Sequence, residues 1–323
     1  MMRRRMVMRT FAATAFASCS IVNAQSTARV YRVAMLYVAA PFSNAFTKRL
    51  QELGYEQSRN LRFEVAGSDV PLGQLPAVAR AMADRRPDVM VAAGSEAVLD
   101  AVERAAGATP IVMLFIDFDP VARDRVVSLA RPGRNLTGLS LQQIDLAAKK
   151  LELLKEAVPR ATRIAVLFDD STREQQRRAQ EEAKALGVTL LPQELRGDSY
   201  DYDGAIRAAV SDKAQAVLIL SSGVFFSGRF KLFDAIDRAR LPSMASPAFR
   251  DAGAMLCYGA NFLYMYVRAA EIVDRILRGG QKPGDIPIEQ PTRFQFIVNL
   301  NTARALAVSI PQSLLLRADE VIR

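Results

Sequence analysis

The chain has 323 residues, of which 50% are hydrophobic and 24% charged, a composition typical of a globular protein with two ordinary domains. It contains no histidine, which excludes Ser-His-Asp and Cys-His catalysis and the usual imidazole zinc sites. The formal net charge is +9, but lysine and arginine are dispersed beside glutamate and aspartate, and no basic block is interleaved with aromatic residues. This pattern argues against nucleic-acid binding.

The N-terminus has the form of an export signal. Residues 3–9 carry four arginines, and the apolar run 10–22 is shorter than the ~20 residues that span a bilayer. We therefore expect residues 1–24 to be a signal peptide, cleaved after Ala24, and the mature protein to be periplasmic. The pair Arg4-Arg5 makes twin-arginine export as well supported as general secretion. A membrane anchor and a lipid attached at Cys19 are the alternatives.

The first half of the chain alternates hydrophobic strands with amphipathic helices. The apolar run 89–93 is typical of a parallel strand that is covered on both faces, and Gly54 suits a left-handed cap at the end of the first helix. The expected strands are 30–38, 61–66, 89–93 and 111–115, and the expected helices between them are 43–53, 72–86 and 96–106.

The segment 110–140 is expected to link two such units. After the strand 111–115, Asp119-Pro120 is typical of a helix cap followed by a first-turn proline. We expect a short helix over 121–130, a turn over 131–135 and the first hinge crossing over 131–138.

From Ser140 the alternation begins again. Ser140 and Gln143 form a predicted capping box for a helix over 141–158. Further strands are expected at 164–168, 188–195, 216–220 and 241–245, and helices at 172–186, 202–211 and 224–239. Alternation at roughly 25–30 residues per unit predicts right-handed βαβ units. The fold class is therefore α/β, with two doubly wound, Rossmann-like lobes joined by a hinge.

After Gly253 the chain is expected to cross back. A strand over 254–258, a helix over 262–277, a strand over 294–298 and terminal helices over 300–307 and 313–322 follow. We assign 29–137 and about 253–285 to the first lobe, and 138–252 and about 286–323 to the second.

A ligand site is expected where the carboxyl ends of the strands meet, because open α/β sheets bind ligands there. The loops at these ends carry serines at helix starts that suit a carboxylate, acids that suit an ammonium group, and aromatics that suit an apolar portion. This combination predicts a small zwitterion, such as an amino acid. The candidate ligand-binding residues are Phe42, Ser43, Gly94, Ser95, Asp117, Asp119, Asp169, Asp170, Ser171, Ser222, Phe225, Tyr258 and Asn261.

Several of these residues also suit a structural role. Asp119 is favoured as an N-cap over a ligand contact, and one of Asp169 and Asp170 is expected to cap the next helix. Ser43 and Ser171 are equally well explained as caps. Because Asp119 is favoured as a cap, Asp117 is the acid to test first. Phe226, Phe230 and Phe233 have helical spacing and are expected in the core, as is Cys257.

Catalysis is a minority hypothesis. Paired acids can act as general acid and base, but no nucleophile–base pair and no phosphate-cradling loop accompanies them. We expect no cofactor and no metal.

Several segments match a known family: LQELGY at 50–55, DPV at 119–121, SLARPG at 128–133, NLTG at 135–138, KLELLKE at 150–156, EQPTRF at 289–294, VNLNTA at 298–303 and RADEVI at 317–322. Over essentially the whole mature chain, the sequence resembles the substrate-binding proteins of ABC transporters usually labelled as tryptophan/tyrosine-type. The resemblance implies a type I periplasmic binding protein fold, a three-segment hinge and capture of ligand by closure. Where members often carry Asn-Pro after the strand that opens the second lobe, this chain has Asp169-Asp170.

The expected function is therefore capture of a small amino-acid-like ligand, with aromatic ones among the candidates, by a monomer that delivers it to an ABC permease in the inner membrane. A ligand-sensing receptor lobe for a membrane signalling partner is the alternative. A two-lobed transferase or hydrolase is less favoured.

Overall fold

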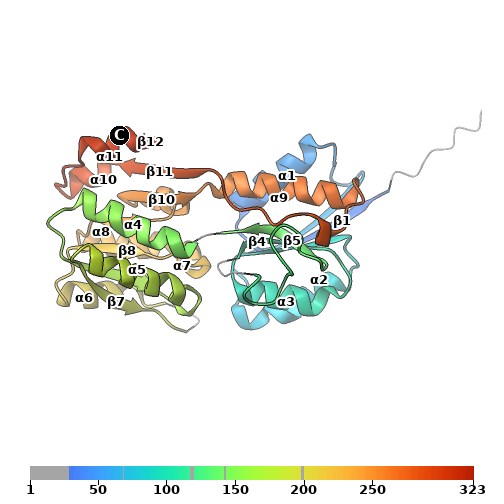
Figure 1. Ribbon diagram of the computed structural model, residues 1–323, viewed down its shortest axis with the longest axis horizontal. Helices are drawn as coiled ribbons and strands as arrows, with labels where there is room; N and C mark the ends of the chain where they lie inside the picture. Colours follow the sequence, from blue (N-terminus) through green and yellow to red (C-terminus); the bar gives the residue numbers. More distant parts are fainter. Residues whose placement is uncertain (1–28, 68, 117–119, 142, 198–199) are drawn as a thin grey trace, which may run out of the picture.

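The computed structural model describes residues 29–323 except 68, 117–119, 142 and 198–199 (Figure 1). The predicted signal peptide and the candidates Asp117 and Asp119 therefore lie outside the described residues. The chain forms two α/β lobes that lie side by side, as predicted. Among the helices of the described part, none has the length and apolar character that a membrane crossing requires.

The first lobe is built on a five-stranded parallel sheet of order β2-β1-β3-β4-β5. Its middle strands are continuous apolar runs, and both faces of the sheet carry a buried core, as a sheet covered on two sides requires. The strands are β1 (Tyr31–Val38), β2 (Leu61–Gly67), β3 (Val89–Ala93), β4 (Ile111–Ile116) and β5 (Leu136–Ser140); the helices are α1 (Ala40–Glu52), η1 (Leu72–Gln74), α2 (Leu75–Ala83) and α3 (Glu96–Ala106).

The second lobe is built on a seven-stranded sheet of order β12-β11-β10-β9-β8-β6-β7, in which β11 runs antiparallel to β10. Its strands are β6 (Arg163–Phe168), β7 (Thr189–Glu194), β8 (Ala216–Ile219), β9 (Ser243–Ala245), β10 (Leu256–Ala260), β11 (Phe294–Asn299) and β12 (Glu320–Ile322). Its helices are α4 (Gln143–Ala157), η2 (Asp170–Thr172), α5 (Arg173–Ala185), α6 (Tyr202–Ser211), α7 (Gly223–Ser227), α8 (Arg229–Arg238), η3 (Pro247–Ala252), α10 (Leu300–Ala305) and α11 (Gln312–Arg317).

Three crossings join the lobes, and they lie beside one another. The first follows Ser140, the second enters α9 (Phe262–Leu277), which packs on α1 of the first lobe, and the third follows η4 (Pro283–Asp285). Glu289 on the third crossing pairs with β5, because Ser140 N donates to Glu289 O at 3.0 Å and Glu289 N to Gly138 O at 2.9 Å. Such short, paired crossings are suited to act as a hinge.

The sheet membership differs from the expected division at the crossings. The strand β10, expected in the first lobe, pairs with β9 and β11 in the second sheet. Ile286 and Ile288, expected in the second lobe, pack in the cores of the first. Hydrophobic periodicity marks each element as buried but carries no information on which sheet receives it, because that depends on nonlocal pairing.

The expected helix over 121–130 does not form. The segment from Pro120 is a series of turns, in which the N–H groups of Arg125 and Val126 both donate to Pro120 O and Asp124 takes a positive φ of 53°. Buried Val126 and the ion pairs of Arg125 with α3 determine this conformation. Tertiary contacts therefore override the cap-and-proline pattern.

Three other expected elements differ from the structure. Ser140 ends β5 and α4 begins at Gln143, so Ser140 belongs to a strand and not to a cap. The expected helix 224–239 breaks into α7 and α8 at Gly228, whose position leaves no room for a Cβ beside the Tyr202 ring. The C-terminal segment ends in the strand β12 rather than in a helix.

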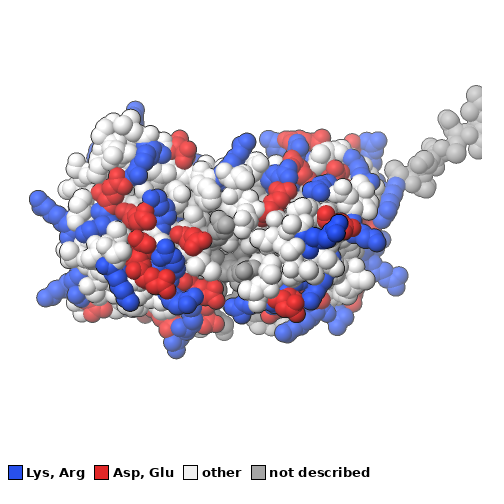
Figure 2. Space-filling view, viewed as in Figure 1, with Lys and Arg blue, Asp and Glu red and all other residues white. Residues whose placement is uncertain are grey.

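Positive and negative side chains are interspersed over both lobes on the face shown in Figure 2. Neither lobe presents a single-sign field on that face. This agrees with the dispersed charge of the sequence.

Candidate ligand cleft

A cavity of about 640 Å³ lies between the lobes, at the carboxyl ends of strands from both sheets. The loops after β1, β3 and β5 form its first-lobe wall, and those after β6, β8 and β9 form its second-lobe wall. We call this cavity the cleft. The predicted residues that line it are Phe42, Gly94, Ser95, Asp169, Asp170, Ser171 and Ser222.

One side of the cleft is an aromatic wall made of Phe42, Phe226, Phe262 and Tyr266. The Phe42 ring stacks on Tyr266 with centroids 5.2 Å apart and an interplanar angle of 10°. It also meets Phe226 of the second lobe at 5.4 Å. Because Phe42 belongs to α1 and Phe226 to α7, this aromatic contact spans the two lobes. Such a wall suits a flat apolar group.

Tyr37 crosses the cleft in a strained backbone conformation. Its φ is 68°, in the left-handed region that a residue with a side chain seldom adopts. A Cβ added at Gly94 would lie 3.2 Å from the Tyr37 ring, and one at Gly223 would lie 3.3 Å from it. The two glycines, one from each lobe, therefore leave the space that this ring occupies. Burial, and secondarily the charge of Asp169, raises the pKa of the Tyr37 phenol.

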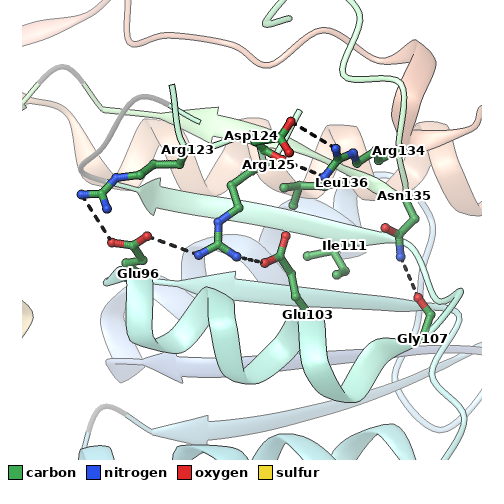
Figure 3. Close-up of a pocket in the computed structure, with 10 residues that line it drawn as sticks. All are labelled: Glu96, Glu103, Gly107, Ile111, Arg123, Asp124, Arg125, Arg134, Asn135 and Leu136. Carbon is green, nitrogen blue, oxygen red and sulfur yellow. Dashed lines mark hydrogen bonds and ion pairs between the residues drawn. The ribbon is translucent and has the colours of Figure 1, made fainter. Parts of the chain in front are cut away.

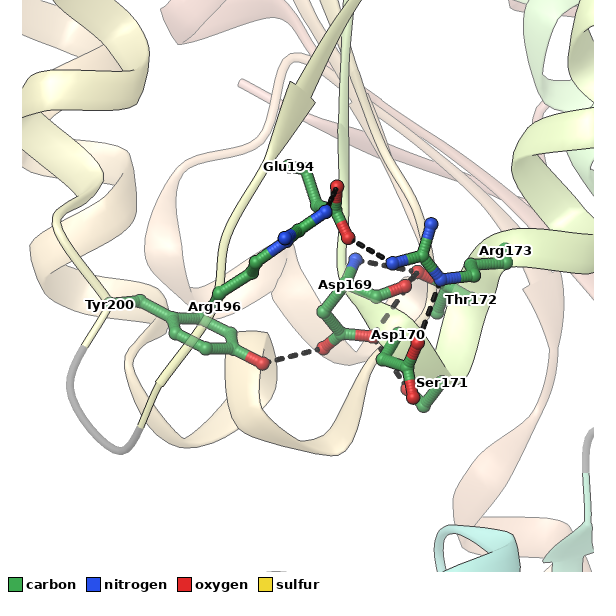
Figure 4. Close-up of polar contacts among 8 residues, drawn as sticks. All are labelled: Asp169, Asp170, Ser171, Thr172, Arg173, Glu194, Arg196 and Tyr200. Atoms are coloured by element: carbon green, nitrogen blue, oxygen red, sulfur yellow. Dashed lines mark hydrogen bonds and ion pairs between the residues drawn. The ribbon is translucent and has the colours of Figure 1, made fainter.

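Asp169 is the centre of a hydroxyl network at the end of β6 (Figure 4). Its side chain forms a capping box with Thr172, and the residue is 3% exposed. Ser171 donates to one carboxylate oxygen at 2.6 Å. Tyr200, at 3.1 Å, and Ser222 donate to the other oxygen. Hydroxyl donors compensate a buried carboxylate without neutralising it, so the network keeps a negative charge beside the cleft.

The tyrosines of this network hold their protons strongly. Burial, and secondarily the charge of Asp169, raises the pKa of Tyr200, and the same two causes raise the pKa of Tyr202 to about 12. Both phenols are therefore neutral at physiological pH. Tyr200 stays a donor to Asp169, and Tyr202 donates to Val224 O at 3.3 Å.

A buried lysine lies behind the second-lobe wall. Lys150 on α4 is 0% exposed, and its Nζ donates to Ser221 Oγ at 2.8 Å. Ser221 lines the cleft, and its backbone is bound by the side chain of Gln175. The network thus holds Ser221 in one position.

Two buried polar atoms of the cleft have no hydrogen-bond partner among the described residues: Ser95 Oγ and Gln143 Oε1. Ser95 precedes α3, but its side chain makes no capping bond. Gln143 begins α4 and is 3% exposed. Leaving such an atom unpaired costs roughly 1–3 kcal/mol, so a bound polar group would be stabilised by both.

The rim of the cleft carries charged side chains whose ion pairs are exposed and therefore weak. Asp170 has a side chain that is 93% exposed and pairs with Arg173 at 2.7 Å. Arg123 of the first lobe lies 3.6 Å from Glu174 of the second, and both side chains are about half exposed. Exposed pairs of this kind contribute about 0–1 kcal/mol.

A second hollow of about 570 Å³ lies on the first lobe, between α3 and the turns after Pro120 (Figure 3). Its charged side chains pair with one another, and we call it the ion-pair groove. Arg125 is bound by Glu96, Asp100 and Glu103 of α3. Arg134 donates to Asp124 O at 2.7 Å. Because these charges pair with one another, the groove is explained by a structural role and requires no ligand.

The phenylalanines of α7 and α8 differ from their expected roles. Phe225, a predicted ligand contact, is fully buried in the second-lobe core, whereas Phe226, expected in the core, lines the cleft. Phe230 is exposed, and only Phe233 is core as expected. Because α7 and α8 are separate helices divided at Gly228, residues at helical spacing on either side of this break do not lie on one face.

Three other predicted contacts lie outside the cleft lining. The hydroxyl of Ser43 donates to Ala40 O within α1, and Asn261 caps α9 by accepting from Tyr264 N at 3.0 Å. Tyr258 on β10 stacks on Phe294 of β11, with centroids 6.3 Å apart. β10 leads into the second crossing instead of ending at the cleft, which explains the position of the last two.

Several lining residues were missed by sequence reasoning: Tyr37, Gln143, Tyr200, Ser221, Phe226 and Tyr266. Tyr37 lies within a hydrophobic run, and Gln143 has the spacing of a capping-box partner of Ser140. Tyr266 follows Phe262 by one helical turn. This spacing places both rings on one helix face and is a signal in the sequence from which Tyr266 could have been predicted. Within the described residues, no group of acids and cysteine is arranged to hold a metal ion.

Comparison with known proteins supports the fold. A conserved domain protein from Vibrio cholerae has a TM-score of 0.81 and 24% identity, covering 91% of this chain and 100% of its own. An ABC domain in complex with L-Trp from Streptococcus pneumonia has a TM-score of 0.81 and 19% identity, with the same coverage. Together with the two lobes, these likenesses confirm the type I periplasmic binding protein fold.

Sequence comparison gives the family. A tyrosine-binding protein of Clostridioides difficile (strain R20291) is 26% identical over 268 residues, which are 81% of this chain and 75% of that protein. The family model for ABC transporter substrate binding proteins matches residues 41–322. The chain therefore belongs to the ABC transporter substrate binding protein family, whose members bind solutes and are not enzymes.

Proposed function

We propose that the protein captures an amino acid with an aromatic side chain in the cleft and delivers it to an ABC permease. The observation that carries this proposal is the pair of buried, unpartnered atoms, Ser95 Oγ and Gln143 Oε1, on opposite lobes of a cleft that has an aromatic wall. A ligand with a polar head and a flat apolar tail would hydrogen-bond to these two atoms and pack on the aromatic wall.

The polar head is proposed to be zwitterionic. Asp169 supplies a buried negative charge, but its oxygens already accept from hydroxyl groups. We therefore expect an ammonium group to meet the oxygens of Ser222 and Ser171, whose hydrogens are directed to Asp169. In this arrangement the carboxylate acts on the ligand through hydroxyl groups that it polarises.

Capture is proposed to involve closure of the lobes. A ligand bound between Ser95 and Gln143 bridges both walls, so it stabilises the closed arrangement over the open one. The contact of Phe42 with Phe226 already crosses the cleft, and the Tyr37 ring lies where a Cβ on Gly223 would come within 3.3 Å of it. Both rings would exclude water around the ligand.

The ligand class is also supported by relatives. The Clostridioides difficile relative is described as a tyrosine-binding protein, and the Streptococcus pneumonia structure holds L-Trp. For this chain we propose export by residues 1–24, a periplasmic location and a monomeric state. The alternative, a sensor lobe that reports ligand to a membrane partner, would leave uptake intact and alter signalling when the gene is deleted.

The test is a thermal-shift panel on purified protein lacking residues 1–24, with amino acids, small acids, nucleosides and sugars. Ligand at 100 times Kd adds about 2.7 kcal/mol of stability. We expect L-tyrosine or L-tryptophan to raise Tm, with titration calorimetry giving Kd. A rise only with a sugar or nucleoside would overturn the proposal, as would no rise with any amino acid.

A further inference from the structure

We propose that Lys150 is a positioning residue that orients the Ser221 hydroxyl as a donor to the ligand's carboxylate, so that the protein selects free acids over neutral derivatives. This inference rests on the proposed function and assigns one end of the ligand to one subsite. The subsite consists of Lys150, Ser221 and Gln175.

The hydrogen-bond direction follows from the chemistry of the amine. A lysine ammonium has donors and no acceptor, so Ser221 Oγ must accept the bond from Lys150 Nζ at 2.8 Å. The hydroxyl hydrogen of Ser221 is then directed elsewhere, and none of the described residues accepts it. Since Ser221 lines the cleft, that hydrogen is available to a ligand. A positive charge one bond behind the oxygen strengthens it as a donor.

Gln175 holds the backbone of Ser221, and the bond from Lys150 holds its Oγ. The backbone N–H of Ser221 donates to Gln175 Oε1 at 3.0 Å, and Gln175 Nε2 donates to Ser221 O at 3.4 Å. Gln175 is itself fully buried on α5. Two backbone bonds to one rigid side chain preorganise the loop after β8, and preorganisation reduces the cost of binding.

The neighbouring serine has the opposite polarity. Ser222 donates its hydrogen to Asp169, so its oxygen faces the ligand as an acceptor, and Val224 N adds a donor at 3.2 Å to that oxygen. Ser221 is therefore backed by a cation and presents a donor, while Ser222 is backed by an anion and presents an acceptor. Two adjacent hydroxyls on one loop can thus read the two charges of a zwitterion in a fixed order.

The experiment compares L-tyrosine with L-tyrosinamide, which lacks the carboxylate, by titration calorimetry. We expect the wild-type protein to prefer the acid by about 10- to 100-fold, the range for a hydrogen bond to a charged group. Lys150→Met should lose most of this preference by weakening tyrosine and leaving the amide unchanged. Lys149→Met is the matched control, because Lys149 is the adjacent, exposed lysine and pairs with Glu152.

Ser221→Ala tests the same route without altering the buried charge. We expect it to lose the acid preference to the same extent as Lys150→Met, and the double variant to lose no more, because both residues act through one hydroxyl. If Lys150→Met does not fold, the Ser221→Ala result alone decides the proposal.

The outcomes separate the two proposals. Wild-type binding with an acid preference that survives in Lys150→Met or Ser221→Ala overturns the subsite and leaves the proposed function intact. Equal weakening of tyrosine and tyrosinamide also overturns it, because that result indicates a structural role. A wild-type protein that binds neither tyrosine nor tryptophan overturns the proposed function and this inference with it.

Discussion

Two hollows of similar volume lie close together in this molecule, and they differ in what their polar groups do. The ion-pair groove, of about 570 Å³, is lined by charges that bind one another. The cleft, of about 640 Å³, combines an aromatic wall with two buried atoms that lack a partner in the described structure. Glu96 and Arg123 line both. Volume and charge therefore do not identify a ligand site, whereas unsatisfied polarity beside apolar surface does.

Replacement of two adjacent aspartates at the cleft should give the most unequal results. In Asp169→Asn the amide group would face hydroxyls that donate, and the buried negative charge would be lost. We expect the Kd of L-tyrosine to rise about 100-fold or more by calorimetry, with a loss of about 1–3 kcal/mol of stability. Asp170→Asn is the control, because its exposed side chain pairs only at the rim. An equal loss of affinity in both variants would refute the role given to Asp169.

Removal of one ring tests the aromatic wall. Phe42→Ala deletes the ring that contacts Tyr266 and Phe226, and burial of such a side chain contributes about 1.5–3 kcal/mol. We expect tyrosine affinity to fall about 10- to 100-fold, while any binding of alanine changes little. Phe230→Ala, on an exposed ring, should leave both affinities unchanged. Retained selectivity for tyrosine over alanine in Phe42→Ala would place the ligand's side chain elsewhere.

Replacement of the central arginine tests the ion-pair groove. Arg125→Met leaves Glu96, Asp100 and Glu103 close together without the cation between them. We expect a loss of about 1–3 kcal/mol in urea unfolding and an unchanged Kd for tyrosine. Arg134→Met, with its exposed pair, should cost less than about 1 kcal/mol. A large loss of affinity in Arg125→Met would make the groove part of the ligand site.

The same variant has a pH signature. Burial raises the pKa of Glu103 and the charge of Arg125 opposes this, so Arg125→Met should raise that pKa further. When the pKa of an acid is higher in the folded state, the folded protein loses stability as pH rises above the ordinary pKa of that acid, here near 4.5. The stability deficit of Arg125→Met should therefore be larger at pH 8 than at pH 4.5, and a reversed order would contradict this cause.

The smallest effect is expected where the two hollows meet. Arg123→Gln removes an exposed pair with Glu174 across the cleft rim. Such pairs contribute less than about 1 kcal/mol and are screened by salt. We expect a change in Kd of less than about threefold, and the change should vanish in 0.5 M salt. A large effect that persists at high salt would contradict this and would mean that the pair stabilises the closed arrangement of the lobes.

Much of the candidate site could be predicted because strand ends are visible in sequence. Ser95, Asp169 and Ser222 each follow an apolar run, and parallel strands bring such ends to one edge. Phe225 and Phe226 show the limit. Which of two adjacent rings faces the cleft depends on the break at Gly228, and the packing of Tyr202 against that glycine lies outside the local pattern.

The alternation of strands and helices, the two α/β lobes and the loops that meet between them could all be predicted from the amino-acid sequence. These properties follow from local hydrophobic period and turn chemistry. Three features emerge only in the folded chain: β10 joins the second sheet, residues 121–130 form turns beside α3, and Lys150 lies behind Ser221. Each of these depends on contacts between residues far apart in the chain, whose pairing no single-segment pattern encodes.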